Sequence, residues 1–446
     1  MLRHLLLAIS LVLLPLQNAF AWTEAFQQHF SDATIRLDYV FCGDASRQEI
    51  YLRQAFRTSA WAGRRENLWE PLLRGNGQIR VLDPVSGECL YANSFSSLFQ
   101  EWTVTEEATR VSKAFENSFQ IPCPLRPVNV EVTLLDTHGN VSARLCHPLD
   151  PGDILIRPLA DNGLPLQVVW QGGPVDQVID IVIVSEGYTV QEEEKFFHDA
   201  QRAASALFSH EPFASEKARF AVRAVFAASA QSGVSVPHEG IWKNTVASSH
   251  FDTFYSERYL TTSSIWTVWD QIGTVPFEHV IVMANTPIYG GGGIYNSLTI
   301  MNSDHKTFVP VLVHEFGHAF AGLGDEYFYD DQFETQYPAG TEPWEPNLTT
   351  LTDFGSKWAD MLPAGTPVPT PVDELEKQDV RPLWGNFTQQ QKDLLNQKVG
   401  VYEGGGYQSR GVYRPVQECR MKINECERFC PVCSRAIVRM IDYYTH

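Results

Sequence analysis

The chain has 446 residues and carries 53 acidic side chains against 34 lysines and arginines, which gives a formal net charge of −19. A surface this acidic repels polyanions, so neither nucleic acid nor anionic lipid is an expected partner. The length is sufficient for two or three domains, and the 44% share of hydrophobic residues is ordinary for a globular protein.

Residues 1–21, MLRHLLLAISLVLLPLQNAFA, have the pattern of a secretory signal peptide. A basic start at Arg3 precedes an apolar run from Leu5 to Leu16, and a small-x-small cleavage site ends at Ala21. The apolar run is too short to span a membrane comfortably. We therefore expect cleavage near Ala21, a secreted or periplasmic mature chain, and no stable membrane anchor in that chain.

Residues 22–165 predict an antiparallel β-sandwich. The stretches TIRLDYVF, from Thr34, and VNVEVTLLD, from Val128, alternate apolar with polar residues at the period of a strand. Turn sequences such as DTHGN separate these stretches. This half of the chain shows no catalytic cluster.

Residues 166–446 predict an α/β domain. Ile179 to Val184 reads as a buried strand, and Thr189 with Glu192 forms a capping box that starts an amphipathic helix. The stretches FAVRAVFA and HVIVMAN read as further strands. Strands that alternate with a helix indicate a layered sheet covered by helices.

The stretch VHEFGHAFAGLGDEY, from Val313 to Tyr327, carries the candidate chemistry. Apolar residues recur at helical spacing, so His314 and His318 would project from one face of a helix and hold one zinc ion. Glu315 would act as the general base for a water molecule that the metal activates. The competing interpretation is an amphipathic helix whose histidines are incidental.

A catalytic zinc ion usually has three protein ligands and an open position. Gly322 and Gly324 would end the helix and turn the chain back, which presents Asp325 or Glu326 to the metal. Asp325, seven residues after His318, is the first choice for the third ligand, and Glu326 is the alternative. The carboxylate that does not bind would orient a ligating histidine.

Three other segments are candidates for the same site. The four glycines of YGGGGIYN, Gly290 to Gly293, indicate a tight turn or a close backbone approach, and Leu298 to Met301 would form an edge strand that pairs with an extended substrate. A plain glycine-rich loop is the alternative.

Met421 would place a thioether beneath the metal, and Tyr413 would donate a hydrogen bond to the oxyanion, although many such residues only pack.

Eight cysteines fall into two groups, four before residue 150 and four after residue 418. In an exported protein, disulfides within each end region are the favoured interpretation. The second group, Cys419, Cys426, Cys430 and Cys433, has spacing that would also suit a second, structural zinc ion. The sequence does not give the pairing.

Several motifs together resemble the IgA peptidase family of secreted zinc metallopeptidases: IDIVIVSEGYT, YGGGGIYN, HEFGHAFAGLGDEY, EPNLT followed by KW, and the closing GVYRP, CRM and FCPVC. The resemblance implies an N-terminal β-sandwich joined to a metzincin-like catalytic domain. It also implies zinc on His314 and His318, an acidic third ligand in the DEY segment, Glu315 as the base and a methionine-bearing turn near Met421. Ordinary metzincins carry a histidine where this chain has Gly324. The family name does not make IgA the substrate.

The predicted function is that of an exported zinc-dependent endopeptidase that hydrolyses peptide bonds of extracellular proteins, with Zn²⁺ as its cofactor and a protein or peptide as its substrate. One alternative is a secreted binding or adhesion protein with a structural or vestigial zinc centre. Another is a zinc amidase that acts on a non-protein substrate. The sequence does not indicate an oligomeric state.

Overall fold

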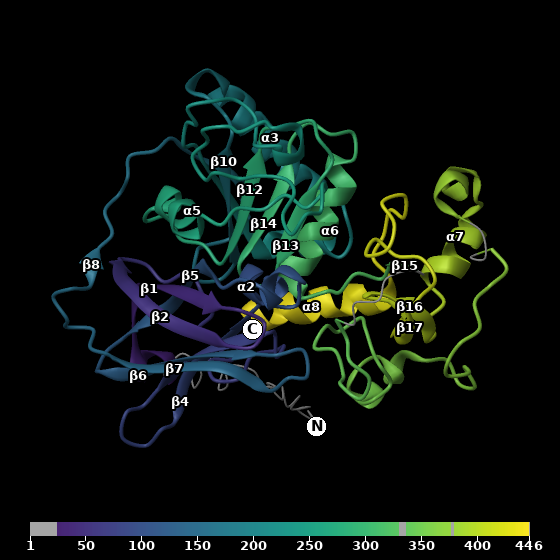
Figure 1. Ribbon diagram of the computed structural model, residues 1–446, viewed down its shortest axis with the longest axis horizontal. Helices are drawn as coiled ribbons and strands as arrows, with labels where there is room; N and C mark the ends of the chain where they lie inside the picture. The colour runs from purple at the N-terminus through teal and green to yellow at the C-terminus, as the bar shows by residue number, and fades with distance from the viewer. Residues whose placement is uncertain (1–24, 330–335, 376–378, 446) are drawn as a thin grey trace, which may run out of the picture.

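A computed structural model describes residues 25–329, 336–375 and 379–445. These residues form an N-terminal β-sandwich and a second unit in which helices cover both faces of a mostly parallel sheet (Figure 1). The expected signal peptide, residues 1–21, lies outside the described ranges. Among the described helices, none is both long enough and apolar enough to cross a membrane.

The sandwich consists of two four-stranded sheets, with strand orders β5-β1-β2-β8 and β4-β3-β6-β7. Neighbouring strands are antiparallel except for the short β2–β8 pair. Alternate side chains of both sheets share one core, as Leu37 and Val130 illustrate, so the predicted alternation is confirmed. The elements are β1 Phe30–Gly43, β2 Gln48–Thr58, β3 Gly77–Leu82, β4 Cys89–Phe95, α2 Leu98–Thr103, η1 Glu107–Thr109, β5 Lys113–Pro124, β6 Val128–Leu135, β7 Val141–Leu149 and β8 Arg157–Pro158.

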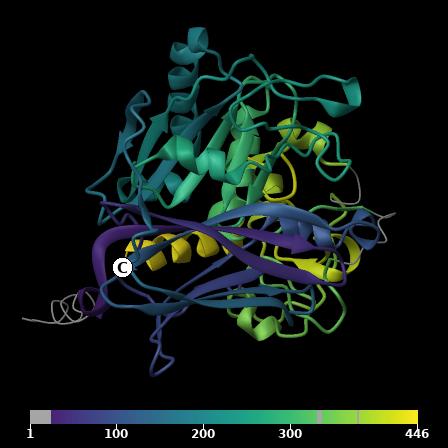
Figure 2. The same ribbon diagram turned by 60° about the vertical axis from the view of Figure 1, so that its left-hand side comes forward.

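The polar face of β1 is buried as well, because the second unit covers it. Arg36 donates hydrogen bonds to Asp38 at 2.7 Å and to Asp270 of helix α5 (Ile265–Ile272) at 2.6 Å. The indole of Trp266, on the same helix, donates to a backbone carbonyl of β5 at 3.2 Å. The two units therefore meet across partly buried polar contacts, and Figure 2 shows the sheets of the sandwich lying beneath the second unit.

The second unit contains a six-stranded sheet with the order β13-β14-β12-β10-β11-β9. The four inner strands are parallel, and both edge strands are antiparallel to their neighbours. The expectation that Leu298 to Met301 forms the edge is wrong, because the glycine-rich β13 covers β14 on its outer side. The strands are β9 Leu166–Gln171, β10 Ile179–Glu186, β11 Phe220–Val225, β12 His279–Ala284, β13 Gly291–Ile294 and β14 Leu298–Asn302.

The two faces of this sheet carry different helices. Ile179, Ile181 and Ile183 share a core with α3 (Glu193–Leu207), α6 (Phe308–Ala321) and α8 (Pro431–Thr445), whereas Val182 and Val184 share another with α5. The predicted capping box of Thr189 and Glu192 is present before α3. Shorter elements here are η2 Val190–Glu192, α4 Phe213–Glu216, η3 Lys217–Arg219 and η4 Pro237–Glu239.

Beyond α6 the chain forms a less regular region that includes a small sheet of order β15-β17-β16. This region lies at one end of α8, so the last helix connects it to the main sheet (Figure 1). Its elements are β15 Phe328–Tyr329, η5 Phe354–Ser356, η6 Ala359–Met361, η7 Arg381–Asn386, α7 Gln389–Asn396, β16 Tyr402–Gly405 and β17 Tyr407–Arg414.

Candidate metal centre

Helix α6 carries the two histidines along the wall of a cavity of about 1060 Å³. Its apolar side chains, among them Phe308, Leu312 and Phe316, are buried in the core beneath the sheet. The opposite side of the helix presents His314, Glu315 and His318 to the cavity. The helical period of the sequence therefore places all three polar side chains on the cavity side.

Gly322 ends α6 and turns the chain toward the histidines. It adopts a left-handed conformation with φ of +60°, and its N–H donates to the carbonyl groups of Gly317 and His318. A side chain at this position would also collide with Trp344 and Leu73. Glycine allows the left-handed conformation and needs no space for a side chain. The helix therefore ends here, and the segment DEY, Asp325 to Tyr327, turns back.

Three side-chain atoms converge beside the helix. The Nε2 atoms of His314 and His318 are 3.0 Å apart, and the Oδ1 atom of Asp325 lies 3.0 Å from the first and 3.2 Å from the second. Ligand atoms held tetrahedrally by one zinc ion at about 2.0 to 2.2 Å stand about 3.3 to 3.6 Å apart. The three atoms therefore match, within a few tenths of an ångström, the spacing of three ligands on one ion.

Backbone carbonyl groups fix the orientation of both imidazoles. His314 donates from Nδ1 to the carbonyl oxygen of Arg420 at 3.0 Å, and His318 donates from Nδ1 to that of Leu323. A neutral imidazole that donates from Nδ1 has its lone pair on Nε2. Both lone pairs consequently point to the position shared with Asp325, as metal-ligating histidines require.

The two oxygens of Asp325 differ in their partners. Oδ2 accepts a hydrogen bond from the hydroxyl of Tyr407, whereas Oδ1 is buried and accepts none from the described residues. Burial on its own raises the pKa of Asp325, but the positive charge that His318 and His314 carry when protonated holds it well below its usual range. A buried, ionised oxygen without a hydrogen bond is costly unless a cation compensates it, so this donor set fits a divalent metal.

Glu326, the alternative third ligand, points elsewhere. Its Oε1 accepts a hydrogen bond from Asn347 at 2.9 Å and lies 3.1 Å from the sulfur of Cys433. Its backbone N–H donates to the carbonyl of Met421 at 2.8 Å. Glu326 is thereby directed into the protein interior, and the structure brings Asp325 to the imidazoles.

Glu315 lies near both histidines, although the carboxylate of Asp325 is closer to them. One of its oxygens is within 4.8 Å of the ligand nitrogens of His314 and His318. Burial raises the pKa of Glu315, and the two imidazoles partly offset this. Gly293 of β13 packs on the helix here, since a Cβ at that position would collide with the Glu315 carbonyl oxygen.

Other residues that line the cavity lie outside the HExxH motif, and the sequence does not predict them. Glu101, in helix α2 of the sandwich, lines the cavity and accepts a hydrogen bond from the hydroxyl of Tyr259. Burial raises the pKa of Glu101 to about 7, although the bond from Tyr259 lowers it. Arg258 also lines the cavity and donates to Tyr329 at 2.6 Å. No local pattern distinguishes these residues, because only the packing of distant segments brings them here.

Two expectations about the C-terminal region have different outcomes. The buried Met421 lies beneath α6, where its sulfur would be 3.1 Å from a Cβ placed on Gly317, so a thioether floor remains a prediction. Tyr413 is not among the described residues that line the cavity, and its backbone pairs with Thr349 instead. The structure thus does not place Tyr413 on the cavity wall, and its role as oxyanion donor stays a prediction, whereas Tyr407 of β17 lines the cavity and donates a hydrogen bond to Asp325.

A helix that presents an HExxH motif to an open cavity, with a third acidic side chain beside it, is the arrangement of a metallopeptidase. A family model described as IgA Peptidase M64 matches residues 168–441, and one described as Peptidase M64 N-terminus matches residues 25–146. The chain belongs to the IgA peptidase M64 family, which confirms the resemblance seen in the sequence. A comparison with curated proteins found no match.

Proposed function

We propose that the protein is an exported zinc endopeptidase that hydrolyses peptide bonds of extracellular proteins. In this proposal residues 1–21 direct export, residues 22–165 form the sandwich domain, and residues 166–446 form the catalytic domain. The observation that carries it is the convergence of His314, His318 and Asp325 next to Glu315 on the wall of an open cavity. A purely structural site has no use for a carboxylate beside such a cavity, which disfavours a binding protein with a vestigial centre.

A bound zinc ion would supply Lewis-acid chemistry, because it polarises a carbonyl group and lowers the pKa of water to about 7. His314, His318 and Asp325 would hold it. Glu315 takes a proton from the attacking water and can return it to the leaving amine nitrogen. The carbonyl groups of Arg420 and Leu323 and the hydroxyl of Tyr407 keep the ligands in place.

The cavity supports a polypeptide as the substrate. It is shared by both units of the protein and is large enough to bury several residues of an extended chain. Glutamates of the sandwich, Glu101, Glu106 and Glu107, line it, as does Arg258 of the catalytic unit. The cavity thus offers charged groups of both signs around a peptide backbone.

The direct test is the variant Glu315→Gln, compared with Glu194→Gln on the exposed side of α3. Because the amide cannot accept the proton, peptide hydrolysis should fall about 100- to 10,000-fold while zinc content stays unchanged. The measurement combines turnover of a peptide library with metal analysis of the same samples. Hydrolysis that survives a chelator, or full turnover by Glu315→Gln, would contradict the proposal.

A further inference from the structure

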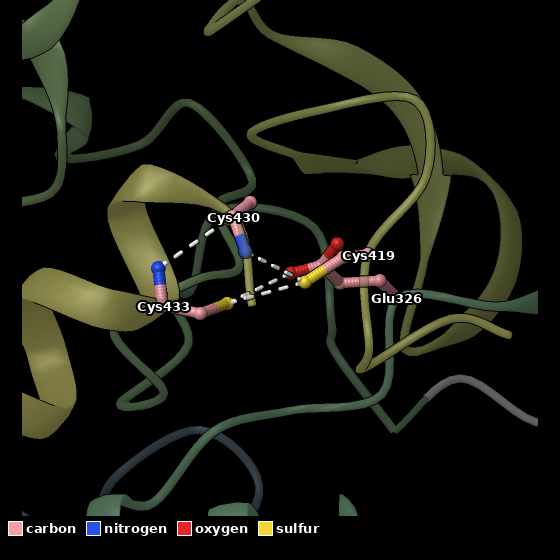
Figure 3. Close-up of side chains that lie close together, drawn as sticks. All are labelled: Glu326, Cys419, Cys430 and Cys433. Atoms are coloured by element: carbon pink, nitrogen blue, oxygen red, sulfur yellow. Dashed lines mark hydrogen bonds between the residues drawn. The ribbon is translucent and has the colours of Figure 1, made fainter. Parts of the chain in front are cut away.

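A second group of potential ligands lies in the interior, away from the cavity. Glu326, Cys419, Cys430 and Cys433 are all buried, and one ligand atom from each lies within 4.8 Å of the others. In Figure 3 the sulfurs of Cys419 and Cys433 point toward each other, with the Glu326 carboxylate beside them. None of these four residues lines the cavity or takes part in the proposed mechanism.

The distances within this group suit a metal ion. The sulfurs of Cys419 and Cys433 are 3.9 Å apart, and the Cys433 sulfur lies 3.1 Å from Glu326 Oε1. Two thiolates bound tetrahedrally to zinc at about 2.3 Å stand about 3.8 Å apart. A disulfide requires about 2.05 Å, and the observed sulfur–sulfur separation is instead close to that of two ligands of one ion.

Backbone N–H groups are directed at two of the sulfurs. Cys430 donates from its N–H to the sulfur of Cys419 at 3.3 Å, and Cys433 donates to the sulfur of Cys430 at 3.4 Å. Cys430 directly precedes helix α8, whose first turn contains Cys433. Amide hydrogens and the positive end of a helix stabilise thiolates, which is the form that binds a metal.

The carboxylate of Glu326 gives an independent indication of a bound cation. Its Oε2 atom is buried and accepts no hydrogen bond from any described residue, while Oε1 accepts one from Asn347 at 2.9 Å. A carboxylate in the interior with an unpartnered oxygen is costly without a counter-charge. A cation held jointly with the cysteines removes that cost.

We propose that Glu326, Cys419, Cys430 and Cys433 form a second metal site that binds zinc in a closed, structural coordination. The site differs from the four-cysteine zinc site predicted from spacing, because the Cys426 sulfur is not among the ligand atoms that lie within 4.8 Å of one another. Cys426 packs with Trp384 and Leu395 and donates to the carbonyl of Arg428 at 3.4 Å. Glu326 takes the fourth position in its place.

The second site would tie together three segments that position the catalytic ligands. Glu326 follows Asp325 directly, and Cys419 precedes Arg420, whose carbonyl orients His314. Helix α8, whose first turn contains Cys433 and which Cys430 directly precedes, packs on the same core as α6. This consequence rests on the proposed function, whereas the existence of the second site does not.

The test uses the full chain with the first centre removed. The double variant His314→Ala/His318→Ala, purified without added chelator, should retain about one zinc ion per chain by mass spectrometry of the metal. Adding Cys430→Ser and Cys433→Ser should bring this to zero, whereas Cys426→Ser is the matched control that should keep it. Loss of all zinc from the histidine variant would overturn the second site while leaving the first centre intact as a proposal.

A spectroscopic measurement keeps the proposal testable if the serine variants do not fold. Cobalt(II) added to the metal-free histidine variant should give thiolate-to-cobalt charge-transfer absorption and the visible bands of a tetrahedral ion. Glu326→Gln should bind cobalt at least about 10-fold more weakly. A spectrum without thiolate bands, or peptide mapping that finds a disulfide among Cys419, Cys430 and Cys433, would overturn it.

Discussion

At the scale of single residues, the proposed chemistry depends on the different partners of the two carboxylate oxygens of Asp325. Oδ1 faces two imidazole nitrogens and Oδ2 accepts the hydrogen bond of Tyr407. Tyr407 is in turn held because its N–H donates to the carbonyl of Tyr327 at 3.0 Å. A hydroxyl that restrains a metal-binding carboxylate lowers the entropy that the carboxylate must lose on binding, so in the proposed site Tyr407 would be a positioning residue.

Tyr407→Phe should therefore weaken zinc binding about 10- to 100-fold, since the phenyl ring keeps the packing but not the hydrogen bond. Competition with a chromophoric chelator measures this directly. Tyr413→Phe is the matched control on the same strand, and it should leave zinc affinity unchanged. Equal effects of the two substitutions would show that the cavity-facing hydroxyl has no such role.

At the scale of elements, one side of helix α6 packs in the hydrophobic core and the other side lines the cavity. Its buried side meets the ring of His279, the first residue of β12, which lies 4.9 Å from Phe320 and 5.4 Å from Tyr444 between ring centroids. Nε2 of His279 has no hydrogen-bond partner among the described residues. The imidazole is thus held neutral in an aromatic setting, and burial lowers its pKa to about 3.

This burial links stability to pH. The unfolded chain protonates His279 near pH 6.5 and the folded chain near pH 3, so its contribution is present above pH 6.5 and is lost as pH falls toward 3. Between pH 7 and pH 5 the loss should be about 2 kcal/mol of unfolding free energy. His279→Leu should flatten the dependence of the urea midpoint on pH by this amount. His138→Leu, which removes an exposed imidazole, should keep the wild-type slope.

At the scale of the whole molecule, the two units share both an interface and the cavity. The Arg36 guanidinium, buried in β1, is paired with the fully buried Asp38 and with Asp270, whose side chain is 59% exposed. Asp38 also accepts hydrogen bonds from Gln54 and Ser118. This network fixes the sandwich against α5, and the sandwich in turn delivers Glu101 to the cavity. The sandwich is therefore a structural part of the candidate site.

Asp38→Ala should lower the unfolding free energy by about 3 to 5 kcal/mol, because it leaves the buried Arg36 without its main counter-charge. Asp270→Ala, which removes an exposed partner of the same guanidinium, should cost at most about 1 kcal/mol. Urea denaturation followed by tryptophan fluorescence compares the two variants. Similar losses for both would mean that the buried carboxylate does not organise this interface.

The sequence predicts those structural features that are determined by residues close together in the chain. The alternation around Val130, the capping box of Thr189 and the termination at Gly322 each depend on a few consecutive residues, and the structure has all of them. The sequence does not predict β13 as the edge strand because glycines have little strand propensity, yet β13 forms where α6 requires a close approach. Glu101 was missed because its partner Tyr259 lies 158 residues away.

The sequence by itself determined that His314, Glu315 and His318 share one side of a helix, because the 3.6-residue period allows no other arrangement. It also determined the family through its motifs. Only the tertiary structure placed Asp325, and not Glu326, beside the imidazoles, since adjacent side chains after a turn point in opposite directions and the surrounding partners select one. The tertiary structure likewise placed Glu326, and not Cys426, beside Cys433. Glu326 and Cys433 are 107 residues apart in the sequence, and a contact between them depends on how the segments pack and not on the spacing of the residues.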